Sequence, residues 1–93
     1  MREVTLRPRA ERDLRQIGPG PERTRIVAGL RELGADAANL DVKALAGAAP
    51  WLRLRIDNYR VLYRAAGESA YVVERIVHRR DLDRAVDRLP SSG

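Results

Sequence analysis

The sequence contains no cysteine, so it can form no disulfide, hold no thiolate-bound metal and carry no redox-active thiol. It also has no phenylalanine and a single tryptophan, so leucine, valine, isoleucine and alanine must build the core. No run approaches the roughly 20 apolar residues that span a membrane, and the N-terminus lacks an apolar stretch of signal-peptide length. These absences predict a cytoplasmic protein with no membrane partner.

Lysine is almost absent as well, because Lys43 is the only lysine among 18 basic residues. The formal net charge is +5 and the isoelectric point is about 10.7. Most of this charge lies between Trp51 and Arg80, where seven arginines face three acidic residues. The clustering, more than the total, indicates an anionic partner.

With 93 residues the chain has room for one domain, predicted to span residues 1–93. Hydrophobic residues make up 44% and charged residues 33% of the chain, which are globular values. A chain of this size buries only about 60–65% of the surface that its unfolded form exposes. Its stability should therefore be modest without a partner.

The N-terminal third predicts a strand followed by a helical hairpin. Residues 3–6 alternate polar and apolar, as a short strand does. A helix follows Pro8, with apolar residues at helical spacing up to Ile17, and the "GPGP" of residues 18–21 ends it. A second helix is expected from Glu22 to Leu33, with Gly34 as its C-terminal cap.

After an irregular segment, the period of the pattern changes to two. Strands are predicted over 52–56, 59–65 and 70–77, with a tight turn at Asp57-Asn58 and another at Gly67. A short C-terminal helix over 81–89 and a "PSSG" tail complete the chain. The order β-α-α-β-β-β-(α) predicts an α+β fold, in which the helical hairpin packs on one face of a small antiparallel sheet.

Several segments resemble the RelE/ParE superfamily of toxins from type II toxin–antitoxin systems. "LRPRAERDLRQI" resembles the family's opening strand and helix, and "VKALAG" resembles its "KxLxG" segment. "LRLRIDNYRVLYRA" is similar to the family's arginine-bearing hairpin, and "VVERIVHRRDL" is similar to its closing strand with the "HRRD" ending. The resemblance runs in order through most of the chain.

This resemblance implies a microbial-RNase-like fold and a cognate antitoxin that wraps the toxin. For RelE-like members it implies cleavage of mRNA on the ribosome without metal or other cofactor. For ParE-like members it implies inhibition of DNA gyrase without nuclease activity. The hairpin arginines and the "HRR" run favour the ribonuclease; a gyrase inhibitor and a plain nucleic-acid-binding module are the alternatives.

Metal-independent RNA cleavage needs groups that stabilise negative charge on phosphorus, and guanidinium groups do so through paired donors. The resemblance makes Arg60 the residue that cradles the scissile phosphate and Arg79 a contact to the phosphate or leaving group. It places Arg53 where many members keep a basic residue that supports the transition state. The structural alternative for Arg60 and Arg79 is an ion pair with Glu74 or Asp81.

Further RNA contacts are expected from residues around this set. They are Arg55, Arg64, Arg80 and Trp51. For Arg55 and Arg64 a solvated face of the sheet is an equal alternative, and Trp51 is more often a core residue at a strand start than a platform for a base.

Two residues are candidates for proton transfer. His78 is the only histidine and titrates near neutrality when unperturbed, but a lone histidine at a strand end is more often structural. Asp83 stands where the family's "HRRDVY" pattern has a tyrosine. The loss of that ring removes a stacking contribution of about 1–3 kcal/mol and favours the gyrase alternative.

Overall fold

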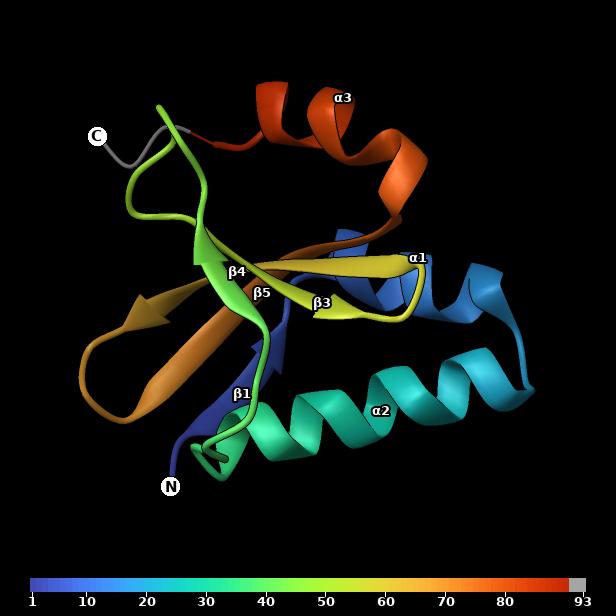
Figure 1. Ribbon diagram of the computed structural model, residues 1–93, viewed down its shortest axis with the longest axis horizontal. Coiled ribbons are helices and arrows are strands. Elements are labelled where there is room, and N and C mark those ends of the chain that lie inside the picture. The colour runs from blue at the N-terminus through green and yellow to red at the C-terminus, as the bar shows by residue number, and fades with distance from the viewer. Residues whose placement is uncertain (91–93) are drawn as a thin grey trace.

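The computed structural model describes residues 1–90, in which a five-stranded sheet carries helices on both faces (Figure 1). The Ser91–Gly93 part of the predicted tail lies outside the described residues. The elements are β1 (Glu3–Leu6), α1 (Pro8–Ile17), α2 (Pro21–Gly34), β2 (Val42–Ala44), β3 (Leu52–Ile56), β4 (Tyr59–Ala66), β5 (Ala70–His78) and α3 (Leu82–Asp87), with a 3-10 turn over Arg79–Asp81. The α+β fold is confirmed, and the predicted elements occur in the predicted order with one further strand, β2, between α2 and β3.

The sheet is mixed, with the order β1-β5-β4-β3-β2. Strands β2 to β5 form an antiparallel meander, whereas β1 pairs in parallel with β5, from Glu3 beside Ala70 to Leu6 beside Val73. The prediction of an antiparallel sheet is therefore wrong for β1. Alternation within a strand shows which side chains share a face, but it does not show which strand lies alongside or in which direction it runs.

Strand β2 was not predicted, because its three residues lie in the segment interpreted as irregular. All three are exposed at the edge of the sheet, with Lys43 opposite Arg53 on β3. β2 is only three residues long and all of them are exposed, so its short apolar-polar-apolar pattern is not enough to indicate a strand.

The two long helices begin at prolines, and two glycines of α2 lie against its neighbours. Gly34 is the last residue of α2, and a Cβ there would lie 2.9 Å from the carbonyl oxygen of Arg2. A Cβ on Gly29 would lie 2.4 Å from Cδ1 of Ile56 on β3. The small residues therefore let α2 approach the sheet closely.

The core lies on both sides of the sheet. Helices α1 and α2 cover one face through Ala10, Ile26 and Leu30, which pack with Val61 and Ile76. The other face is covered by α3, where Ala85 packs with Leu62 and Val77. Figure 1 shows α3 on one side of the strands and the helical hairpin on the other. No helix among residues 1–90 combines the length and apolar character needed to cross a membrane.

Candidate functional site

The β3–β4 hairpin carries arginines on the sheet face that α3 partly covers. The alternating residues Leu54, Val61 and Tyr63 point into the core with α1 and α2. The remaining positions, Arg53, Arg55, Arg60 and Arg64, therefore share the opposite face. Arg55 lies directly opposite Arg60 across the ladder, so two guanidinium groups start from adjacent points of the sheet.

Arg60 is the residue on which this positive charge converges. Burial lowers its pKa, and the positive charges of Arg55, Arg53 and Arg79 lower it further. Of the three residues predicted to act together, Arg53 and Arg79 thus lie close enough to Arg60 to lower its pKa, and Arg55 does so as a fourth member.

The contacts of Arg60 hold its side chain at the end of the hairpin. Its Nη1 donates to the carbonyl oxygens of Asp57 and Tyr59, at 3.0 Å each. Within residues 1–90 neither Arg60 nor Arg79 forms an ion pair, so the alternative of a salt bridge to Glu74 or Asp81 does not occur there. Both guanidinium groups retain a net positive charge that can act on an anion.

Asp41 is a member of the site that sequence reasoning missed. Its carboxylate lies 3.0 Å from Nη1 of Arg53 and 3.9 Å from Nη1 of Arg55. The hydrogen bond from Arg53 lowers the pKa of Asp41, and the charges of Arg53, Arg55 and Arg60 add to this effect. Asp41 directly precedes β2, and it reaches the arginines because β2 pairs with β3. Without β2, the sequence pattern gives no reason to expect Asp41 beside these arginines.

Arg79 is positioned by the turn of the hairpin. Its backbone N–H donates to the carbonyl oxygen of Asn58, 2.7 Å away, which ties the 3-10 turn to the Asp57-Asn58 turn. The φ of Asp57 is +52°, a conformation that aspartate tolerates better than most residues. Arg79 and Arg80 are both exposed beyond this tie.

His78 caps the 3-10 turn. Its Nδ1 accepts a hydrogen bond from the backbone N–H of Arg80 at 3.2 Å, and its ring packs edge-on against Tyr59, with centroids 5.6 Å apart. A nitrogen that accepts a hydrogen bond carries no proton, so the neutral ring has its proton on Nε2. In this arrangement the free nitrogen of His78 is a hydrogen-bond donor and not a proton acceptor.

Trp51 and Arg64 lie at the other end of the hairpin. The Trp51 ring is only 4% exposed, and its Nε1 donates to the carbonyl oxygen of Pro90 at 3.2 Å. The guanidinium of Arg64 lies 5.8 Å from the centre of that ring. Trp51 is therefore a core residue, as the alternative interpretation holds. Its ring is not exposed and so does not support the predicted stacking on a base.

Asp83 is exposed in the first turn of α3 and makes no ion pair or side-chain hydrogen bond among the residues that the structure describes. The charges that shift the pKa of Arg60 include that of Asp41 but not that of Asp83. The structure thus brings the arginines together and leaves Asp83 outside their immediate group.

A comparison with protein families matches residues 4–83 to the ParE toxin of the type II toxin–antitoxin system parDE. The chain belongs to this toxin family. The resemblance to the RelE/ParE superfamily is thereby confirmed over most of the sequence. A comparison with curated proteins found no match.

Solved structures with this fold include toxins from three organisms. The RelB–RelE antitoxin–toxin complex of Methanococcus jannaschii contains a chain with a TM-score of 0.72 and 25% identity, and the match covers 88% of this chain and 98% of that one. The RelBE2 toxin–antitoxin complex of Mycobacterium tuberculosis gives 0.61 and 29%, covering 84% and 98%. A copper-bound mutant toxin of Helicobacter pylori gives 0.70 with 15% identity, covering 88% and 99%, which shows the fold alone.

Proposed function

We propose that this toxin is an endoribonuclease that cleaves mRNA on the ribosome without a metal ion, as a single domain spanning residues 1–93 that acts in the cytoplasm. The observation that carries the proposal is the convergence of Arg53, Arg55 and Arg79 on Arg60, with no acidic partner on Arg60 or Arg79 within residues 1–90. Such a group supplies the positive charge and the N–H donors that the oxygens of a phosphodiester accept.

In the proposed reaction the 2′-hydroxyl of the RNA loses its proton as its oxygen attacks the adjacent phosphorus, the bond from phosphorus to the 5′-oxygen breaks, and the 5′-oxygen takes up a proton. The products are a 2′,3′-cyclic phosphate and a free 5′-hydroxyl. Arg60 binds the non-bridging oxygens, where negative charge grows in the transition state, and Arg79 donates to the departing 5′-oxygen. A well-placed donor of this kind contributes roughly 3–4 kcal/mol.

Arg53 binds the phosphate only after its contact with Asp41 breaks. In the free protein its Nη1 donates to the carboxylate of Asp41 at 3.0 Å, so a phosphate that binds Arg53 competes with that carboxylate. The pair is exposed on the Asp41 side, and exposed ion pairs are weak enough for a phosphate group to displace. Proton transfer is assigned to His78 or Asp83, with His78 holding its Nε2 proton as a donor in the present arrangement.

We also propose a cognate antitoxin as the partner of this chain. Two of the similar solved structures are toxin–antitoxin complexes. A small domain with a net charge of +5 suits an acidic, partly disordered segment that folds onto it. Co-expression with the neighbouring gene should give a complex that survives purification, and repeated failure to recover one would contradict this part of the proposal.

A gyrase inhibitor is the second candidate, favoured by two observations. The family match is to the ParE toxin, and Asp83 occupies the place of the tyrosine that the resemblance assigns to ribonuclease members. In this function the arginine face would bind gyrase and no RNA would be cut.

Induced expression followed by mapping of transcript 5′ ends separates the two functions. The ribonuclease predicts cuts that repeat with the codon period, whereas a gyrase inhibitor predicts an SOS response with intact transcripts. Arg60→Ala should lower cleavage by roughly 10²–10³-fold. Arg12→Ala, which removes one exposed arginine from α1, is the matched control and should cleave like the unmodified toxin.

Retained cleavage in folded Arg60→Ala would remove Arg60 from its role. Intact transcripts with an SOS response would replace the ribonuclease by the gyrase inhibitor.

A further inference from the structure

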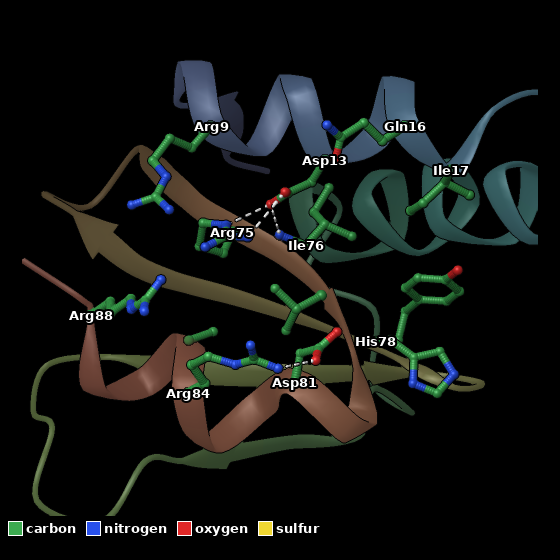
Figure 2. Close-up of a pocket in the computed structure, with 13 residues that line it drawn as sticks. Arg9, Asp13, Gln16, Ile17, Arg75, Ile76, His78, Asp81, Arg84 and Arg88 are labelled. Carbon is green, nitrogen blue, oxygen red and sulfur yellow. Dashed lines mark hydrogen bonds and ion pairs between the residues drawn. The ribbon is translucent and has the colours of Figure 1, made fainter.

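A second basic site lies at the edge of β5, between α1 and α3 (Figure 2). It is a hollow of about 420 Å³, within the range of sites that hold small ligands or a few side chains. Its floor is apolar, formed in part by Ile76, Val77 and Ala85, all of them buried. Its charged lining consists of Arg9, Asp13, Arg75, Asp81, Arg84 and Arg88.

Both acidic residues of the hollow already have partners. Asp13 accepts from Nε of Arg75 at 2.8 Å and from Nη2 of the same residue at 3.2 Å. Asp81 accepts from Nη2 of Arg84 at 2.9 Å. Guanidinium groups of the hollow thus already bind carboxylates, and Arg75 holds Asp13 in the two-bond geometry that such pairs favour.

Two arginines of the hollow have no such partner. Arg9 on α1 and Arg88 just after α3 form no ion pair or side-chain hydrogen bond within residues 1–90. Figure 2 shows both side chains extending toward the side of the hollow where Arg75 lies. The charged lining therefore has two surplus positive charges, supplied from opposite walls.

The hollow exists because β1 is shorter than β5. The ladder between them ends where Leu6 lies beside Val73, and beyond it β5 has no strand on that side. The carboxylate of Asp13 takes the place of a strand there, because it accepts the backbone N–H of Ile76 at 2.9 Å. The carboxylate of an acidic side chain thus already accepts one of the backbone N–H groups at this open edge.

The hollow is separate from the arginine group of the hairpin. Tyr59 and His78, which line it, are paired across the β4–β5 ladder and alternate with the pair Arg60 and Val77. Tyr59 packs with the α1–α2 core, so its side chain leaves the sheet on the face opposite Arg60. The lining of the hollow includes Val77, the neighbour of Arg60 across the ladder, but none of the arginines Arg53, Arg55, Arg60 and Arg79.

We infer that this hollow binds an acidic segment of a partner protein, with two carboxylates on Arg9 and Arg88 and an apolar side chain between them on the floor. The two carboxylates already bound there, those of Asp13 and Asp81, favour an acidic peptide as the ligand. This site extends the antitoxin part of the proposed function, and its binding test does not depend on RNA cleavage.

The test is a binding measurement on the whole chain. The probes are a fluorescein-labelled hexapeptide of alternating glutamate and leucine, and a fluorescein-labelled octauridine, each titrated with the toxin at physiological ionic strength. The double variant Arg9→Gln/Arg88→Gln should weaken peptide binding by roughly tenfold or more. The double variant Arg12→Gln/Arg15→Gln removes the same charge from exposed positions of α1 outside the hollow and should change it by less than about twofold.

Equal losses in the two double variants would overturn the inference, because they would show a general charge effect. Absence of peptide binding would overturn it as well. A loss of octauridine binding confined to the Arg9→Gln/Arg88→Gln variant would assign the hollow to nucleic acid instead. Arg88→Gln alone gives the same comparison if the double variant unfolds. The assay needs no turnover, so failure of the ribonuclease proposal would leave its outcome intact.

Discussion

Arg53 and Asp41 are joined twice, because Nη1 of Arg53 lies 3.0 Å from both the carbonyl oxygen and a carboxylate oxygen of Asp41. The backbone N–H of Arg55 donates to the same carbonyl at 3.0 Å. One residue before β2 therefore fixes the first strand of the arginine hairpin and also places a negative charge beside Arg60. Asp41 both orders the site and opposes its binding of anions.

Asp41→Asn separates these two effects. The amide keeps the shape and the backbone contacts but removes the charge that competes with phosphate. We expect its affinity for single-stranded RNA to rise by roughly two- to fivefold, the effect of one exposed charge. Fluorescence anisotropy with a labelled oligonucleotide measures it, and a weaker complex would show that the charge of Asp41 holds Arg53 in its binding position.

The same variant has a predictable dependence on pH. Arg53 lowers the folded-state pKa of Asp41 below its ordinary value of 3.8. The pair therefore stabilises the fold above about pH 4, and this contribution is lost as the pH falls through the lowered value. Urea unfolding of the toxin and of Asp41→Asn should differ at pH 6 and converge in strong acid. A difference that grows toward acid pH would contradict the assignment.

Asp13 links α1 to β5 through Arg75 and the backbone of Ile76. The hydrogen bond with Asp13 raises the pKa of Arg75, and both side chains are largely buried, at 12% and 20% exposed. Asp13→Ala leaves a guanidinium and an N–H without their partner, so we expect a loss of about 2–3 kcal/mol in the free energy of unfolding. Urea titration measures this loss. Glu11→Ala, on an exposed position of α1, is the control and should lose less than about 0.5 kcal/mol.

The sequence predicted the strands and helices in which apolar residues recur at a regular spacing. The strands β3 to β5 and the helices α1 and α2 were placed within one or two residues, because each buries one face of a regular element. The parallel partner of β1 and the exposed strand β2 were missed. Neither leaves a mark in the pattern of apolar residues, since pairing and direction are set by contacts between distant segments.

The residues of the candidate site likewise fall into two groups: those that the sequence pattern predicts and those that only the tertiary fold brings together. Alternation predicts that Arg53 and Arg55 share a face, and the tight turn expected at Asp57-Asn58 adds Arg60 to that face. Asp41 joins them only through β2, and the partner of Arg75 is Asp13, 62 positions away in the chain, instead of a neighbouring residue. Such partners depend on the tertiary fold, and a single sequence carries no local signal for them.

Tyr63 gives the toxin a limit at alkaline pH. Burial raises its pKa to about 12, and it packs edge-on against Tyr71 with centroids 5.3 Å apart. Because the folded-state pKa is above the ordinary value of 10.0, the stability that it contributes is complete below pH 10 and is lost as the pH rises toward 12. Tyr63→Phe should flatten the fall in unfolding free energy between these values and remove the last tyrosinate component from an absorbance titration. An unchanged titration would refute the burial argument.

His78 can be tested for its two roles with two substitutions. Its Nδ1 accepts the backbone N–H of Arg80, and asparagine can provide a side-chain acceptor at the same capping position. If His78 serves only to hold Arg79 and Arg80 in place, His78→Asn should cleave RNA within about threefold of the unmodified toxin, with the same pH profile. His78→Ala, which loses the cap, should cleave more slowly with that profile still unchanged.

A proton-transfer role predicts instead that the cleavage rate of both variants falls by about 10²–10⁴-fold and that the limb of the pH profile assigned to the imidazole disappears. Since Nε2 carries the proton while Nδ1 is engaged, we expect the first pattern, which would leave Asp83 as the candidate for proton transfer.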